Sequence, residues 1–304
     1  MKIWSQWSDL SVPQGFTALT GDEIAPSESE LGSIEIYVPR YMAGPATLEP
    51  IARMSALKII QSPNAGYDDV LKVLPEGVTL CNAAGVHDVS TAELAMGLAI
   101  AARRGFTEFI ANQQNGVWVH KLWPSIADSR VAIVGAGHIG TLIASHMKAF
   151  QAEVQLFSRS GEGSANKISE FDTLLPTFDI VVLILPLNDE SRGFMSAKRL
   201  AKMKDGSLLV NVARGPVVDT DALINELNSG RIFAGLDVTD PEPLPDGHPL
   251  WSAKNVIISP HVGGDSSAFE SRGKKLVEDQ LALLASGSPL KNVVAGPTRN
   301  RMSS

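Results

Sequence analysis

An apolar run at residues 131–134 is followed at once by three glycines, Gly135, Gly137 and Gly140, in the segment VAIVGAGHIG. The run predicts a buried strand, and apolar residues at helical spacing after the glycines predict a helix over 138–150. In such a unit the first glycine permits a tight turn, the second lets a pyrophosphate approach the backbone, and the third lets the helix pack close to the strand. The helix N-terminus offers N–H groups and a positive dipole end to phosphates. The segment predicts dinucleotide binding, with a purely structural turn as the alternative. The expected phosphate contacts are Gly135, Gly137, His138, Ile139 and Gly140.

The apolar runs that follow this turn indicate the fold. They predict strands over 153–157, 179–185, 207–212, 232–238 and 255–259, and a helix over 219–228. Consecutive apolar strands with crossover connections are typical of a doubly wound parallel sheet covered on both faces. The sequence therefore predicts an α/β fold with a Rossmann cofactor domain.

The first third of the chain predicts a second, smaller α/β domain. Short strands are expected over 2–4, 34–39, 57–61 and 78–82, helices over 46–55 and 68–74, and a surface loop over 21–33. This rhythm implies a small parallel sheet, which we expect to be flavodoxin-like. At about 150 residues per domain, 304 residues suit two domains.

We expect the last helix, over 266–285, to return to the first domain. The predicted division is then 1–95 and 275–304 for the substrate-binding domain, with 96–274 as an inserted dinucleotide-binding domain. A helix over 89–104 is apolar almost all round, so we expect it to be buried between layers or domains.

Residues 106–125 show little periodicity but carry the large apolar side chains Phe109, Trp118 and Trp123. We expect an irregular segment that either packs on its own domain or forms a subunit interface. The second alternative predicts a homodimer through the cofactor domain.

Composition excludes several classes of partner. Lys and Arg number 26 against 33 Asp and Glu, a net charge of −7, and nucleic-acid binding usually needs a basic surface. Nearly apolar stretches are strand-sized, far below a membrane span of about 20 residues, and the start MKIWSQWSDL has no signal-type apolar run. The single Cys81 forms no intrachain disulfide, and His138, His146 and His248 lack ligand-like partners for a metal. We expect a cytoplasmic protein with no nucleic-acid, membrane or metal partner.

The end of the second strand, EVQLFSRSG, bears on the choice of dinucleotide. An acidic residue there would bind the ribose 2′-OH of NAD, but the position holds Ser158, followed by Arg159 and Ser160. Arg159 can bind a 2′-phosphate through two charge-assisted hydrogen bonds. This favours NADP(H). NAD(H) stays open if Arg159 is only a solvated loop residue.

Three later motifs follow apolar strands: VNVARGPVVD, GLDVTDPEP and SPHVGG. They lie at the edge where open α/β sheets bind ligands. Together with the glycine turn and NAGYDDV, they resemble the D-isomer-specific 2-hydroxyacid dehydrogenase family over nearly the whole chain, in particular its glyoxylate/hydroxypyruvate reductases.

The resemblance implies three catalytic roles. Arg214 would bind the substrate carboxylate and carbonyl, His261 would transfer the proton, and Glu242 would hydrogen-bond that histidine. The chemistry is sound, because a protonated histidine can donate near neutral pH and a carboxylate behind it favours the charged form. Asp240 competes with Glu242, which we prefer because it occupies the family's position before Pro243. Individually, each of these residues could also be an ordinary surface or turn residue.

The resemblance also implies further contacts. Backbone N–H groups of Asn64, Ala65 and Gly66 would receive the substrate carboxylate, beside Arg214 and His261, and Arg40 and Tyr41 would line the side-chain pocket. Asp237 would hold the nicotinamide carboxamide, with a strand-end cap as the alternative. The substrate would lie in a cleft between the domains, whose closure excludes water. The remaining cofactor contacts implied are Pro186, Ala213 and Gly264.

The expected function is hydride transfer from NADPH to a small 2-oxo acid, such as glyoxylate or hydroxypyruvate, which gives a D-2-hydroxy acid. Phosphoglycerate and phosphite dehydrogenases are alternatives on the same fold. Formate dehydrogenases also share this fold, but they carry glutamine at the position of Glu242, so we exclude this activity. A dinucleotide-sensing binding protein, like the family's corepressors, is the alternative from another class.

Overall fold

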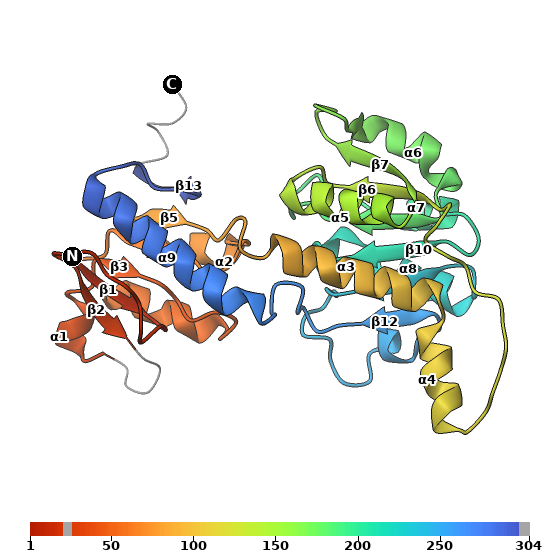
Figure 1. The fold of residues 1–304 in the computed structure, drawn as a ribbon, viewed down its shortest axis with the longest axis horizontal. Coiled ribbons are helices and arrows are strands. Elements are labelled where there is room, and N and C mark those ends of the chain that lie inside the picture. The colour runs from red at the N-terminus through yellow and green to blue at the C-terminus, as the bar shows by residue number, and fades with distance from the viewer. Residues whose placement is uncertain (21–25, 298–304) are drawn as a thin grey trace. The chain divides into compact units, whose positions relative to one another are not determined.

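The computed structural model describes residues 1–20 and 26–297, and the chain divides into two units (Figure 1). Unit 1 holds Met1–His87 and the chain from Asp265 on, and unit 2 holds Asp88–Gly264. The sequence predicts domain boundaries at 95/96 and 274/275, whereas the two units divide at 87/88 and 264/265. Both boundaries come earlier because each of the two helices near them packs, over its whole length, on the sheet of a single unit. Helix α3 (Asp88–Arg103) packs on the sheet of unit 2, and α9 (Ala268–Ser286) packs on that of unit 1.

The sheet of unit 1 has the strand order β13-β5-β4-β3-β1-β2. Strands β1 to β5 pair in parallel in the order 2-1-3-4-5, and β13 adds to β5 in antiparallel fashion. This is the flavodoxin-like order that we predicted. The strands are β1 (Lys2–Ser5), β2 (Thr17–Thr20), β3 (Ile36–Tyr37), β4 (Ile59–Gln61), β5 (Thr79–Cys81) and β13 (Val293–Ala295).

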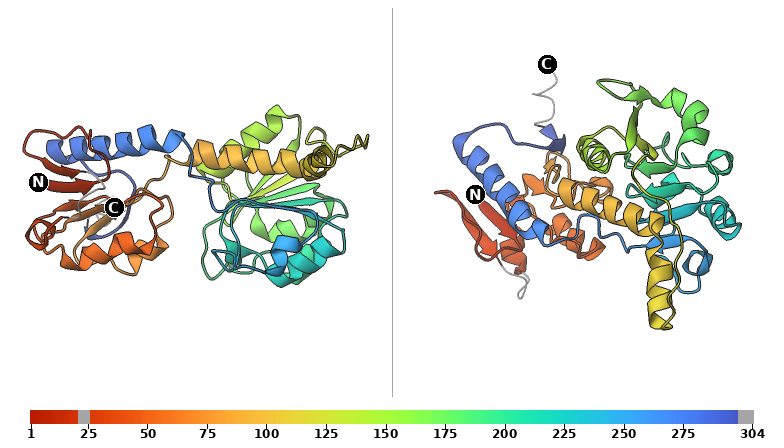
Figure 2. Two further views of the ribbon diagram at one scale, coloured as in Figure 1. Left: turned by 90° about the horizontal axis from the view of Figure 1, so that it is seen from below. Right: turned by 45° about the vertical axis from the view of Figure 1, so that its right-hand side comes forward.

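Helices cover both faces of this sheet (Figure 2). On one face α9 contributes Phe269, Val277 and Leu281 to the core. The other face is covered by α1 (Glu28–Leu31), the 3₁₀ helix η1 (Pro45–Arg53) and α2 (Asp68–Leu71).

Unit 2 contains a seven-stranded parallel sheet in the order β12-β11-β10-β9-β6-β7-β8. The order reverses between β6 and β9, which is the switch point of a doubly wound Rossmann sheet. The predicted α/β class is confirmed. The strands are β6 (Arg130–Val134), β7 (Glu153–Ser158), β8 (Asn166–Lys167), β9 (Ile180–Leu183), β10 (Leu208–Asn211), β11 (Phe233–Leu236) and β12 (Val256–Ile258).

Two helical layers bury this sheet, which explains why β9 and β10 are wholly apolar or buried. Helices α3 and α5 (His138–Ala149) pack on one face, and α6 (Phe171–Leu174), α7 (Ala197–Lys202) and α8 (Thr220–Asn228) on the other. Short 3₁₀ helices occur in the connections. They are η2 (Ile168–Glu170), η3 (Leu175–Thr177), η4 (Gly215–Val217) and η5 (Pro249–Ser252).

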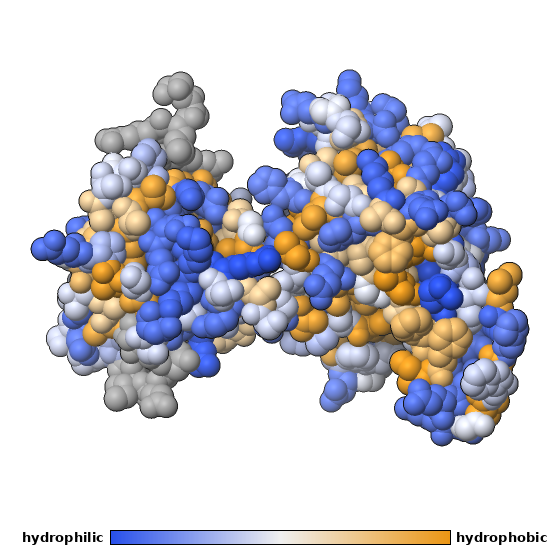
Figure 3. Space-filling model, viewed as in Figure 1, coloured by the Kyte–Doolittle hydropathy of each residue, from blue (hydrophilic) through white to orange (hydrophobic). Residues whose placement is uncertain are grey.

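The segment predicted as irregular begins with a helix, α4 (Phe106–Gln114). None of its residues is buried, so no apolar stripe reveals the helix in the sequence. Trp123 packs on Gly105, whereas Trp118 and Leu122 in the irregular part are 97% and 93% exposed. Apolar side chains are visible over α4 and the chain after it in Figure 3.

Two smaller predictions also need correction, and one strand was not predicted. The predicted surface loop over 21–33 contains α1, while its residues 21–25 lie outside the described part. The helix predicted over 68–74 ends at Leu71. Strand β2 was not predicted, because its sequence TALT is short and half polar. Among the described residues, no helix has both the length and the apolar character needed to cross a membrane.

Candidate active site

The glycine turn after β6 cannot accept side chains at two of its three glycines. Gly135 has φ +120°, and a Cβ on it would lie 2.0 Å from the carbonyl oxygen of Ile184. A Cβ on Gly140 would lie 1.9 Å from the carbonyl oxygen of Gly135. The turn and the close packing of α5 on the sheet therefore both require glycine.

The second glycine is different, because a Cβ on Gly137 would meet, among the described residues beyond its immediate chain neighbours and its own helix, no atom within 4 Å. Gly137 is the N-cap of α5, and because it has no side chain it does not cap the first N–H groups of the helix. His138 and Ile139 begin the first helical turn. Open space above a helix N-terminus is what a phosphate needs. The turn therefore fits the pyrophosphate of a dinucleotide.

At the end of β7, two hydroxyls shape the next turn. Ser158 Oγ accepts a hydrogen bond from the N–H of Gly161 at 3.0 Å, and Ser160 Oγ accepts one from Glu162 at 3.4 Å. Arg159 is exposed, and its Nη1 lies 3.4 Å from Oε2 of Glu190. Sequence reasoning missed Glu190, which is far away in the chain. An exposed pair of this kind contributes little, so an anion can compete for Arg159.

The turn after β10 carries Arg214 and is held by Asn211, a buried residue that sequence reasoning also missed. Asn211 accepts a hydrogen bond from the N–H of Ala213 and donates one to the carbonyl of Arg214, both at 3.1 Å. Arg214 Nη1 donates to the carbonyl of Ala213 at 2.7 Å. A Cβ on Gly215 would lie 1.8 Å from the carbonyl of Thr239, so this turn packs tightly on the one that leads to Glu242.

His261 and Glu242 meet directly. Nδ1 of His261 lies 2.5 Å from Oε1 of Glu242, and both side chains are a little over one third exposed. His261 has φ +55°, and its N–H donates to the carbonyl of Asp237 at 2.8 Å. The structure thus pairs the histidine with Glu242, whereas the carbonyl of the rival Asp240 accepts from the Thr220 hydroxyl at 3.0 Å.

The charge on Glu242 is stabilised at this position. Burial alone would raise its pKa, but the hydrogen bond and positive charge of His261 hold the pKa below the ordinary value of 4.5. A backbone hydrogen bond from Thr239 and the positive charge of Arg214 act in the same direction. Glu242 is therefore ionised at neutral pH and can support an imidazolium at His261.

The Asp237 carboxylate is almost fully buried, with 3% of the residue exposed, and it is hydrogen-bonded to the loop that carries His261. Oδ1 accepts from the Ser259 hydroxyl at 2.7 Å and from the N–H of Val262 at 2.9 Å. Oδ2 accepts from the N–H of Gly263 at 2.9 Å. A carboxylate has about four acceptor positions, so these bonds leave room for one more donor.

Two other expected cofactor contacts lie in loops of unit 2. The carbonyl of Pro186 accepts a hydrogen bond from the Ser191 hydroxyl at 2.7 Å, and Gly264 is the last residue of the unit.

In unit 1, the loop of Asn64, Ala65 and Gly66 follows β4. The Asn64 carbonyl accepts from Ala83, and the Ala65 carbonyl accepts from the Asn82 side chain. Within the described part of the chain, the N–H groups of Ala65 and Gly66 donate no hydrogen bond. The carbonyls of Asn64 and Ala65 are therefore occupied, while the N–H groups of Ala65 and Gly66 are available to a ligand.

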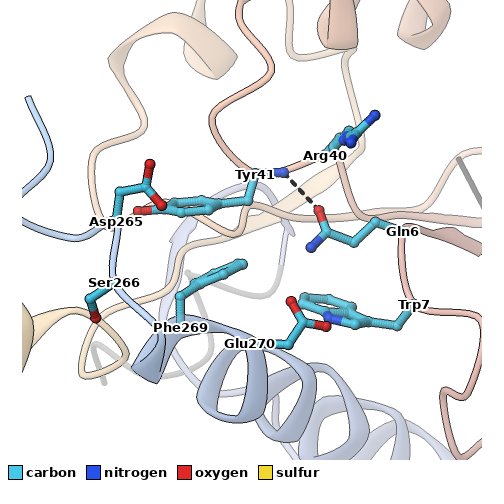
Figure 4. A pocket seen from close by; sticks show the side chains of 8 residues that line it. All are labelled: Gln6, Trp7, Arg40, Tyr41, Asp265, Ser266, Phe269 and Glu270. Atoms are coloured by element: carbon cyan, nitrogen blue, oxygen red, sulfur yellow. Dashed lines mark hydrogen bonds between the residues drawn. The ribbon is translucent and has the colours of Figure 1, made fainter.

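Arg40 and Tyr41, the expected side-chain pocket residues, line one pocket of about 380 Å³ in unit 1 (Figure 4). Tyr41 stacks on Phe269 with ring centroids 3.7 Å apart, and its N–H donates to Gln6. The other lining residues are Trp7, Asp265, Ser266 and Glu270.

Two further side chains of unit 1, those of His87 and Cys81, are buried. The His87 ring lies beside both Tyr41 and Phe269, with centroids 5.2 and 5.5 Å away, and its Nε2 lies 2.8 Å from the carbonyl of Pro63. Cys81 is buried in β5, and burial raises its thiol pKa to about 12. No group of three His, Cys, Asp or Glu side chains suited to a metal occurs among the residues described.

Comparison with known proteins yields a family match. The NAD binding domain of the D-isomer specific 2-hydroxyacid dehydrogenase family matches residues 96–263. A hydroxypyruvate reductase from Thermotoga maritima is 32% identical, over 81% of this chain and 83% of its own. The human glyoxylate reductase/hydroxypyruvate reductase is 33% identical, over 77% of this chain and 76% of its own.

A solved structure of a related reductase is similar to this chain over nearly its whole length. The NADPH-dependent glyoxylate/hydroxypyruvate reductase from Sinorhizobium meliloti, in complex with NADP and sulfate, is similar with a TM-score of 0.81 and 26% identity. The similarity covers 97% of this chain and 98% of that one.

Proposed function

This chain belongs to the D-isomer specific 2-hydroxyacid dehydrogenase family, and we propose that it is an NADPH-preferring reductase of small 2-oxo acids of the glyoxylate/hydroxypyruvate type. The coarser activity follows from the family: the protein is an NAD(P)-dependent oxidoreductase that acts on the CH–OH group of 2-hydroxy acids. The proposal adds the cofactor preference, the direction and the class of acid.

The observation that carries the proposal is the contact of His261 with Glu242 on the same sheet edge as the glycine turn. The glycine turn follows β6, Arg214 follows β10, Glu242 follows β11 and His261 follows β12. These are the carboxyl ends of parallel strands, so a dinucleotide at the turn and a proton donor belong to one site.

The residues supply the acid–base part of the reaction. NADPH, when bound, supplies the hydride for the carbonyl carbon of the oxo acid. His261, protonated and supported by Glu242, donates a proton to the carbonyl oxygen. Arg214 binds the planar carboxylate with paired donors and orients the carbonyl toward His261.

We propose that the cofactor is held along the edge of unit 2. The pyrophosphate would lie at Gly135–Gly140 and the 2′-phosphate at Ser158, Arg159 and Ser160. Asp237 would accept from the nicotinamide carboxamide through the acceptor position that its loop leaves open. Pro186, Ala213 and Gly264 are proposed as backbone contacts.

In unit 1 we propose that the loop at Asn64, Ala65 and Gly66 binds the substrate carboxylate, chiefly through the N–H groups of Ala65 and Gly66, because the N–H of Asn64 already donates to Ser62 Oγ at 3.2 Å. The support is that the donors of Ala65 and Gly66 make no hydrogen bond within the described residues, while small side chains leave the backbone accessible. Arg40 and Tyr41 are proposed to contact the substrate side chain.

A panel of 2-oxo acids assayed with NADPH and with NADH tests this function. We expect NADPH oxidation with glyoxylate or hydroxypyruvate, and a higher kcat/KM with NADPH than with NADH. If NADPH binds but no acid is reduced, the sensing protein becomes the better interpretation. Phosphohydroxypyruvate, or phosphite in the reverse direction, as the preferred substrate would contradict the proposed class of acid.

We also propose a homodimer formed through unit 2. The support is the run of exposed apolar residues over α4 and the segment after it, including Ile110, Trp118 and Leu122. Large exposed apolar patches mark interaction sites. Light scattering should give twice the chain mass for the wild type and a monomer for a Trp118→Ser/Leu122→Ser variant. A monomeric wild type would contradict the proposal.

A further inference from the structure

The edge strand β8 brings a second cation beside the end of β7. The two strands pair in parallel, with Ser158 and Lys167 as Cα partners. Neighbouring strands lie about 4.8 Å apart, and partner side chains project from the same face of the sheet. Ser158 occupies the position that contacts the ribose 2′ group in dinucleotide-binding domains. Lys167 therefore stands next to the place where NAD(H) and NADP(H) differ.

The stem of this lysine lies beside the turn between the two strands. Gly161 has φ +69°, and a Cβ on it would lie 2.6 Å from Cγ of Lys167. The N–H of Gly161 is itself bound to Ser158 Oγ at 3.0 Å. The aliphatic stem of Lys167 thus lies against the backbone of the Ser158 turn, which leaves its charged end free to extend toward solvent or a ligand.

The two cations near this turn differ in their partners. Arg159 already has the carboxylate of Glu190 at 3.4 Å. Lys167 is exposed, and no carboxylate in the described part of the chain forms an ion pair with it. An arriving phosphate must compete with Glu190 for Arg159 but meets no such competitor at Lys167. The hydroxyls of Ser158 and Ser160 can add hydrogen bonds.

We propose that Lys167 is a specificity-determining residue whose ammonium binds the 2′-phosphate of NADP(H). This inference rests on the proposed NADPH preference and assigns part of that preference to one residue. NAD(H) has no 2′-phosphate, so Lys167 contributes to the binding of only one of the two cofactors.

Titration calorimetry of NADP⁺ and NAD⁺, with no substrate present, tests the role without relying on turnover. For Lys167→Ala we expect the Kd of NADP⁺ to rise about tenfold, equal to about 1.4 kcal/mol, with the Kd of NAD⁺ unchanged. Lys167→Arg should retain most of the NADP⁺ affinity, because it keeps the charge. Lys148→Ala, which removes an exposed lysine from the end of α5, is the matched control and should change neither Kd.

Two outcomes would overturn the inference in distinguishable ways. If the wild type binds NADP⁺ more tightly than NAD⁺ and Lys167→Ala keeps that ratio, the preference stands and Lys167 has no part in it. The same holds if the variant weakens both cofactors equally, since the lysine would then only support the turn. If the wild type binds both cofactors equally, the NADPH preference itself fails, and the role of Lys167 fails with it.

Discussion

The Nδ1 atom of His261 lies 2.5 Å from Oε1 of Glu242, so this contact does not use Nε2, the other ring nitrogen of the partly exposed histidine. The hydrogen bond orients the imidazole, and the carboxylate favours its protonated form. For His261→Ala we expect kcat for oxo-acid reduction to fall by roughly 10²–10⁴. The Kd of NADPH should stay within a factor of about two, because the histidine binds no phosphate in our assignment. Near-normal turnover would remove His261 from proton transfer.

Glu242→Gln should change how the rate depends on pH. The amide keeps a hydrogen-bond acceptor but removes the charge that stabilises the imidazolium. Reduction needs the protonated histidine, so the decline of kcat/KM toward high pH should begin at a lower pH in the variant. An unchanged pH profile, with any loss of rate equal at all pH values, would contradict a supporting role for the charge.

The same pair should make stability depend on pH in a defined direction. The folded pKa of Glu242 is lowered from 4.5, so its stabilising contribution is complete above the unfolded value and is lost as pH falls through the folded value. Denaturant unfolding of the wild type and Glu242→Gln should therefore differ most near neutral pH and converge below pH 4.5. The effect should be small, since the pair is more than one third exposed.

Arg214→Ala should separate substrate binding from cofactor binding. Losing the paired donors to the carboxylate should raise KM for the oxo acid at least tenfold, by about 1.4 kcal/mol or more. Calorimetry with NADP⁺ should show little change. Arg214→Lys keeps the charge without the paired geometry and should recover only part of the loss. Equal losses for substrate and cofactor would count against the assigned role.

Ser158→Asp should move the cofactor preference toward NADH. A carboxylate at this position can accept from the ribose 2′-OH but repels a 2′-phosphate. We expect the ratio of kcat/KM for NADPH to that for NADH to fall by at least about tenfold. Ser145→Asp, on an exposed turn of α5, controls for added negative charge. An unchanged ratio would show that the end of β7 does not contact the 2′ group.

Asp237→Asn should disturb the loop that carries His261. The amide nitrogen cannot accept from the backbone N–H groups of Val262 and Gly263, so at least one buried donor loses its partner. We expect the free energy of unfolding to fall by about 1–3 kcal/mol, together with a lower kcat. The exposed Asp246→Asn is the control. If stability is unchanged and only NADPH binding weakens, Asp237 serves the cofactor alone.

The parts of the site that were predictable from the sequence are those written in contiguous motifs. The glycine turn and the segments around Arg214, Glu242 and His261 each follow an apolar strand, and parallel strands bring their carboxyl ends to one edge. The partners of these residues were not predictable in the same way. Glu190 reaches Arg159 from another loop. Two of the hydrogen bonds to Asp237 come from backbone N–H groups, which every residue type except proline carries, so the sequence gives no sign of them.

In the fold, too, some elements were predictable from the sequence and others were not. Buried strands such as β9 and β10 are predictable because apolar residues fill them, and both sheets have the predicted α/β order. Helix α4 has no buried residue, and β8 has only two residues, so neither leaves a periodic pattern. The pairing of Ser158 with Lys167 depends on that short strand and is visible only in the structure.

The most direct test follows the transferred hydrogen. Hydroxypyruvate is reduced with NADPH that carries deuterium at the transferred position of the nicotinamide, and the product is analysed by mass spectrometry and chiral chromatography. We expect D-glycerate with one deuterium at C2 from the wild type, and almost none from His261→Ala in the same time. Formation of the L isomer, or no deuterated product from an enzyme that binds NADPH and is folded, would contradict the proposed reaction.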